Sequence, residues 1–169
     1  KKLYEDGGLL EHSGYSYDFV GPRALEPEEV FVSERQLAKE QVGYRALIFD
    51  HVESLPAEIA KRLPAYAKAG LALIFIGSVP KTSAFCREES LSWLEPALKG
   101  YENVRILKER CEVVPTLLKW GIYPRAYYQK PAKVLASCRE TKEGMLFYFF
   151  NYGDKDAYWP AQAGQGERF

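Results

Sequence analysis

The chain has 169 residues, the length of one ordinary domain, which is enough for a single hydrophobic core. Hydrophobic residues make up 47% and charged residues 27%, a balance typical of globular proteins and not of disordered chains. Its 23 Lys and Arg match its 23 Asp and Glu, so the basic excess that favours nucleic-acid binding is missing. The longest apolar run, Leu71–Ile76, falls far short of the about 20 residues that span a bilayer. We therefore expect neither a nucleic-acid partner nor a membrane span.

The cysteines and the start of the chain say little about its compartment. Cys86, Cys111 and Cys138 are far apart and form no CxxC pair, so we expect neither a disulfide framework nor a metal site. The sequence begins Lys1-Lys2-Leu3, with no starting Met and no signal segment. We expect a fragment of a longer protein, with its localisation left open.

The first elements lead to a buried strand. Tyr15–Val20 has the composition of a strand, and Pro22–Leu25 that of a short helical turn. Tyr44–Phe49 is an apolar run short enough for a strand that is buried on both faces. Asp50 and His51 come directly after its carboxyl end, where ligand crevices form in α/β proteins.

A helix and a second buried strand follow. Pro56 suits the first turn of a helix, and Gly70 suits its C-terminal end. Pro64 inside this stretch is expected to kink or loosen the helix. The next strand is Leu71–Ile76, so the order predicts a βαβ unit with two parallel strands. The apolar face of the helix recurs at helical spacing in Ile59, Leu63, Tyr66 and Ala67.

The alternation of elements continues downstream. We expect a helix over Glu88–Leu98, a strand over Asn103–Leu107 and a helix over Glu109–Trp120. Strands that alternate with helices in this way predict a three-layer α/β domain with a parallel sheet covered on both faces.

The character of the sequence changes after Pro124. Lys133–Arg139 and Met145–Asn151 are rich in β-forming residues, and the polar stretch between them predicts a hairpin. We therefore expect an α/β domain over 1–124, a β-rich extension over 125–160 that packs on it or on a neighbouring domain, and a flexible tail over 161–169.

Catalytic candidates are few. Ser78 follows a predicted strand, but the residues after it are not the small ones of a nucleophile elbow. His51 could act as a base, although a surface His paired with Asp50 or Glu53 is the simpler interpretation. Cys86 lies beside an arginine that could favour a thiolate. One alternative is therefore a small hydrolase or transferase that uses Ser78 or Cys86 with His51.

A second alternative is a flavin- or nucleotide-binding module. The turn Gly77-Ser78 offers two backbone N–H groups that could hold a phosphate, but the chain has neither a Walker A motif nor GxGxxG. We therefore expect no cofactor.

Aromatic residues are the most distinctive part of the composition. They make up 14% of the chain, with 12 Tyr, and they gather towards its two ends. Tyrosine combines a flat apolar face with a polar tip, which suits sugar contact or a domain interface. In Met145–Asn151 aromatic residues fall on both faces, as in a strand sandwiched between layers. The candidates for this surface are Tyr15, Tyr17, Tyr148 and Tyr152.

The order of motifs resembles a known family. Gly14–Val20 (GYSYDFV), Tyr44–Phe49 (YRALIF) and Val52–Pro56 (VESLP) resemble the class I glutamine-amidotransferase-like domain of large glycoside hydrolases. The likeness is closest to the α-L-rhamnosidase type and more distant to the β-galactosidase trimerisation domain. Leu146–Asn151 resembles a strand that leads into the next β domain of those enzymes. The resemblance covers 17–80 and 132–152, with only the order of elements shared over 81–130.

The resemblance implies a flavodoxin-like fold and an accessory role. Amidotransferases carry their nucleophilic Cys where this chain has Gly77-Ser78, so glutaminase chemistry is not expected. The hydrolases carry their catalytic carboxylates on a barrel, so no catalytic residue is transferred to this chain. Asp18 in the matched motif is expected to orient a loop at the barrel interface or to make a structural hydrogen bond. The expected partners are the barrel and β domains of the parent chain, carbohydrate, or a second copy of this chain.

Overall fold

The computed structural model describes residues 3, 8–28, 30–40, 42–85, 89–124, 126, 134–141 and 144–151. Their contacts form two compact units, one over 18–123 and one that combines 1–17 with 124–169, and each is described by itself. Among the described residues, no helix is both long enough and apolar enough to cross a membrane.

The larger unit is built on a three-stranded parallel sheet. Strands β3 (Ala46–Asp50), β5 (Ala72–Ile76) and β7 (Val104–Leu107) lie in the order β3-β5-β7. Helix α2 (Ala57–Lys68) connects β3 to β5, and α3 (Leu94–Leu98) lies between β5 and β7 in the chain. The predicted βαβ unit with parallel strands is therefore confirmed.

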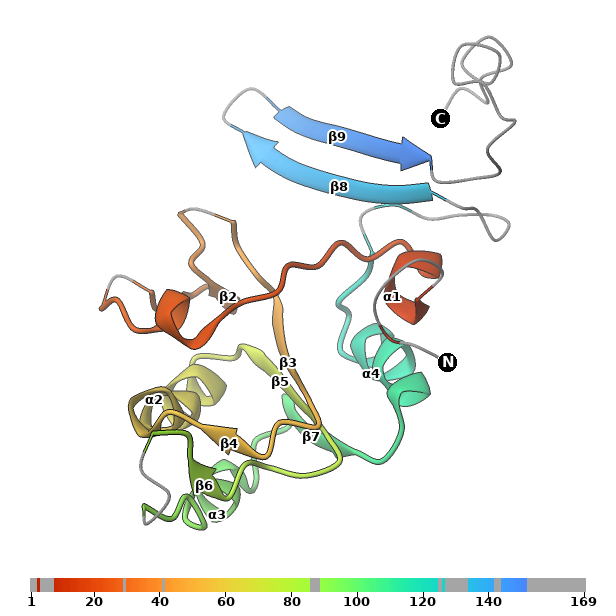
Figure 1. Ribbon diagram of the computed structural model, residues 1–169. Helices are drawn as coiled ribbons and strands as arrows, with labels where there is room; N and C mark the ends of the chain where they lie inside the picture. Colours follow the sequence, from red (N-terminus) through yellow and green to blue (C-terminus); the bar gives the residue numbers. More distant parts are fainter. Residues whose placement is uncertain are drawn as a thin grey trace, which may run out of the picture. The chain divides into compact units, whose positions relative to one another are not determined.

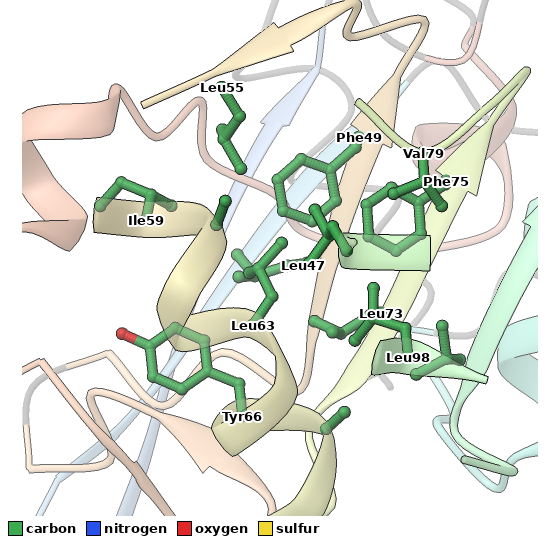
Figure 2. Close-up of a cluster of buried hydrophobic side chains, with 14 of the residues drawn as sticks. Leu47, Phe49, Leu55, Ile59, Leu63, Tyr66, Leu73, Phe75, Val79 and Leu98 are labelled. Atoms are coloured by element: carbon green, nitrogen blue, oxygen red, sulfur yellow. The ribbon is translucent and has the colours of Figure 1, made fainter. Parts of the chain in front are cut away.

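The core fills one face of this sheet. Side chains of β3 and β5 pack against α2 and α3, and the Phe49 and Phe75 rings stack with centroids 4.8 Å apart. Figure 2 shows this cluster, in which side chains of the sheet meet those of α2 and α3. Its labelled members are Leu47, Phe49, Leu55, Ile59, Leu63, Tyr66, Leu73, Phe75, Val79 and Leu98.

The opposite face of β5 is covered as well. Ile74 and Ile76, which alternate with the residues of the first face, are fully buried. Helix α4 (Val113–Lys119) buries Val113 and Leu117, and it lies on the other side of the sheet from α2 (Figure 1). An apolar strand without polar alternation requires cover on both faces, and β5 receives it.

Short elements surround the sheet. The 3₁₀ turn η1 (Pro22–Leu25) forms where a helical turn is predicted. Strands β1 (Val32–Ser33) and β2 (Gln36–Leu37) form an antiparallel pair, and β4 (Ser54–Leu55) pairs in parallel with β6 (Thr82–Ser83).

Three predicted elements differ from the structure. No strand forms over Tyr15–Val20, where the Tyr17 hydroxyl donates to Glu11 and Asp18 accepts a hydrogen bond from Tyr44. The helix predicted over Glu88–Leu98 is only α3, because Ser90 forms a β-bridge with Thr82. The helix predicted from Glu109 to Trp120 divides into η2 (Arg110–Glu112), another 3₁₀ turn, and α4.

The smaller unit contains a helix and a hairpin. Helix α1 (Leu9–His12) contacts β8 (Val134–Thr141), which pairs antiparallel with β9 (Gly144–Asn151). The predicted hairpin is thus confirmed, with Cys138 opposite Phe147. The predicted tail over 161–169 lies outside the described residues, and the predicted domain boundaries stay predictions.

Candidate functional site

Charged residues meet at the carboxyl edge of the parallel sheet. Asp50 ends β3, and its side chain is 14% exposed. Its Oδ1 lies 2.7 Å from His51 Nδ1, and Arg110 Nε donates to Oδ1 and Oδ2 at 3.1 and 2.9 Å. Arg110 belongs to η2, which follows β7. Parallel strands bring the loops after β3 and β7 to one edge, so residues 60 positions apart in the chain form one cluster.

The backbone of His51 is strained in a way that directs its ring. Its φ of +52° lies in the left-handed region, and its N–H donates to the Ile76 carbonyl at 3.0 Å. The imidazole lies against Gly77, where an added Cβ would be 3.2 Å from His51 Cδ2 and 3.6 Å from Nε2. Gly77 itself has a φ of +91°, so two reasons favour glycine at this position. His51 thus directs Nδ1 to Asp50 and lies with Nε2 close to the turn after β5.

The predicted nucleophiles do not complete a catalytic arrangement. Ser78 is exposed, and among the described residues nothing hydrogen-bonds to its hydroxyl, His51 included. Cys86 lies outside the described residues. The structure thus places His51 beside Gly77 but forms no hydrogen-bonded pair of base and nucleophile in the part that it describes.

Three backbone N–H groups at this edge are already engaged. The Gly77 N–H donates to the Leu107 carbonyl at 2.8 Å, so the turn Gly77-Ser78 does not offer the two N–H groups that the sequence suggested. After β7, the Glu112 carboxylate accepts hydrogen bonds from the N–H groups of Lys108 and Glu109 at 3.0 and 2.8 Å. The described residues also contain no group of three His, Cys, Asp or Glu that could hold a metal ion.

The predicted interface residues have different surroundings. Tyr15 is buried, and the Tyr17 hydroxyl donates to Glu11 at 3.0 Å. Asp18 accepts a hydrogen bond from Tyr44 at 2.9 Å, the kind of structural bond considered for it from the sequence. The fourth residue, Tyr148, is 64% exposed. Tyr152 lies outside the described residues.

Strand β9 exposes apolar side chains on both of its faces. Leu146, Tyr148 and Phe150 alternate with Phe147, and these four side chains are 63%, 64%, 50% and 41% exposed, respectively. Phe147 also stacks along the strand on Phe149, with ring centroids 6.0 Å apart. The sequence predicted aromatic residues on both faces here, and the structure leaves large parts of them uncovered.

Arg110 is the functional candidate that the sequence analysis missed. A polar residue just after the third strand of a parallel sheet is the signal that could have placed it beside Asp50.

Comparisons with protein-family models, curated proteins and solved structures found no match, so the resemblance to amidotransferase-like domains has no support from them.

Proposed function

We propose that this chain is a non-catalytic accessory domain of a carbohydrate-active glycoside hydrolase, with a flavodoxin-like three-layer fold. In this role it contacts the catalytic barrel or a neighbouring β domain of the parent enzyme. The motifs that resemble such domains motivate the assignment, and the parallel sheet with helices on either side is compatible with it.

Strand β9 carries this proposal. A two-stranded hairpin is marginally stable in water, and contiguous apolar surface on a protein marks an interaction site. The four large side chains of β9 lie on both faces, so covering one face of the hairpin would still leave the other exposed. A strand with this pattern is suited to a place between layers of a larger assembly.

The carboxyl edge of the sheet supports a role without catalysis. An active Asp–His pair needs a carboxylate that stabilises the imidazolium and a nucleophile that the imidazole can deprotonate. Arg110 already forms an ion pair with Asp50, so this carboxylate is shared between the guanidinium and the His51 ring. Ser78 makes no hydrogen bond to His51. The cluster is thereby suited to joining the loops after β3 and β7.

A labelling experiment tests the accessory role. The reactivity of Tyr148 towards a tyrosine-selective reagent is compared in the chain alone and in the chain joined to its parent catalytic barrel. We expect several-fold protection of Tyr148 by the barrel, because the β9 surface becomes covered. Tyr123 is also 64% exposed but lies outside the hairpin, so it serves as a reference within the same molecule. Equal reactivity of Tyr148 in both forms would contradict the proposal.

A second candidate function is a small serine hydrolase that uses Ser78 and His51. It is favoured by the placement of His51, with Nδ1 at Asp50 and Nε2 near the turn that precedes Ser78. Turnover of aryl esters, aryl glycosides and glutamine by the chain alone decides between the two. The accessory role predicts no turnover above background, whereas activity that is lost in both Ser78→Ala and His51→Ala would establish the hydrolase.

A further inference from the structure

A small cavity lies at the amino edge of the parallel sheet, the edge opposite Asp50. Its volume is about 310 Å³, at the lower end of the range for ligand-binding sites, and it is open to solvent, since Arg35, Arg45 and Glu102 are all exposed. Its walls include Arg45 just before β3, Gly70 just before β5, Glu102 just before β7, and Trp120 just after α4. Arg35, from the turn between β1 and β2, also lines it, as do Ala72, Asn103 and Ile122.

Arg35 lies in the two-residue turn that joins β1 to β2. Glu34 and Arg35 both have positive φ, +49° and +64°, although neither is glycine. Two-residue hairpin turns of this kind need left-handed backbone at both central residues, so these angles follow from the pairing of β1 with β2. The stem of Arg35 lies on Gly70, where an added Cβ would be 2.8 Å from Arg35 Cγ. The missing side chain of Gly70 therefore makes room for Arg35.

The charges around the cavity leave a positive excess. The Arg45 guanidinium is fixed by a hydrogen bond of 3.1 Å to the Gly121 carbonyl. Arg35 and Glu102 have no hydrogen bond or ion pair with any other described residue. Two arginines and one glutamate therefore line the cavity, a balance that suits a ligand with a single negative charge.

Trp120 supplies a flat apolar wall. It is half-buried, and Arg105 lies over its ring at 5.9 Å from the centroid. Arg105 does not line this cavity, so its contact holds the indole without occupying the space. An aromatic ring beside two arginines can hold the planar body of a ligand while the guanidinium groups bind its acidic end.

We propose that this cavity, the Arg35–Arg45 pocket, binds a small organic monocarboxylate whose flat body lies on Trp120. The carboxylate is placed between the two guanidinium groups. Glu102 disfavours ligands with more negative charge, so inorganic phosphate binds more weakly than an aromatic carboxylate. This inference is independent of the accessory role, because every residue involved belongs to the unit over 18–123.

Calorimetric titration of the whole chain with benzoate, and separately with inorganic phosphate, tests the proposal. We expect saturable benzoate binding that shifts the Trp120 indole N–H resonance, which Trp120→Phe assigns by removing it. Arg35→Gln and Arg45→Gln should each weaken binding by about tenfold, since each removes a charge-assisted hydrogen bond. Arg23→Gln makes the same charge change on an exposed arginine outside the cavity and should leave the affinity unchanged.

The Glu102→Gln variant tests the proposal even if an arginine variant fails to fold. Because Glu102 has no hydrogen bond within the described part of the chain, its substitution should leave the fold intact and tighten benzoate binding about threefold. The proposal would be overturned if the titration with benzoate did not saturate by about 10 mM, where binding would be worth only about 3 kcal/mol. It would also be overturned if phosphate bound as tightly as benzoate, or if Glu102→Gln did not change the affinity for benzoate.

Discussion

The free energy of unfolding that is lost when an isoleucine of the sheet is replaced by alanine depends on how deeply its side chain is buried. Ile74 lies in the central strand and is fully buried, whereas Ile106 lies in the edge strand β7 and is 45% exposed. We expect Ile74→Ala to lower the free energy of unfolding by about 2–5 kcal/mol, from lost burial and an unfilled cavity. Ile106→Ala should cost less than about 1.5 kcal/mol. Urea unfolding of both variants measures the difference, and a loss below about 1 kcal/mol for Ile74→Ala would contradict its central place.

Arg62 of α2 forms hydrogen bonds with the last residue of η1 and with the two residues after it. Its guanidinium donates to the carbonyls of Leu25, Pro27 and Glu26 at 2.8, 2.9 and 2.5 Å. Arg62→Met keeps much of the aliphatic stem but leaves these acceptors without the guanidinium, so we expect a loss of about 2 kcal/mol in the free energy of unfolding. Lys61→Met, one position away, loses only the exposed ion pair of Lys61 with Glu58, so it should lower the free energy of unfolding far less than Arg62→Met does. Similar midpoints for both variants would show that the carbonyl contacts contribute little.

At the scale of elements, the start of η2 and α4 depends on a reciprocal cap. Glu112 accepts hydrogen bonds from the N–H groups of Lys108 and Glu109, and the Glu109 side chain accepts one from the Glu112 backbone. Glu112→Ala should cost about 1 kcal/mol in the free energy of unfolding. Glu112→Gln retains an acceptor oxygen and should lose less than half of that. Thermal and urea unfolding compare the two variants, and equal losses would show that the carboxylate charge, and not the acceptor geometry, matters.

Elements set by local pattern could be predicted from the sequence, and those set by distant partners could not. Leu71–Ile76 is apolar throughout and short, which predicts a strand that is buried on both faces. Tyr15–Val20 has strand composition, but the structure forms no strand there, because composition is only a weak guide to pairing in a sheet. Ser90 joins a bridge to Thr82, a partner that the helical pattern around Ser90 does not reveal. Propensity is overridden wherever such a long-range pairing satisfies the backbone.

The candidate site shows the same limit at the scale of the whole molecule. The place of Asp50 and His51 at the carboxyl edge follows from the end of a predicted strand. Their link to Arg110 follows only from the order of the strands, which brings residues far apart in sequence to one edge. The left-handed backbone of His51 also has no sequence signature, because it arises from its hydrogen bond to Ile76 and its contact with Gly77. The contacts of this cluster therefore could not be predicted from the sequence.

The distribution of the core predicts that residues 18–123 fold without the rest of the chain. The main cluster lies between Leu25 and Val104, and the buried residues of α4 lie within the same unit. A chain trimmed to 18–123 should therefore unfold cooperatively, with a free energy of unfolding of about 5 kcal/mol or more. Far-ultraviolet circular dichroism and urea unfolding measure this.

The decisive comparison places Ile74→Ala in both the full and the trimmed chain. If 18–123 is energetically independent of the β8–β9 hairpin, the two losses should agree within about 0.5 kcal/mol, since Ile74 then shares no partner with the removed residues. A trimmed chain that unfolds without cooperativity, or in which the substitution costs far less, would show that the hairpin supports the sheet. In that case the apolar side chains of β9 would be explained by folding within this chain, and the argument for an external partner would lose its main observation.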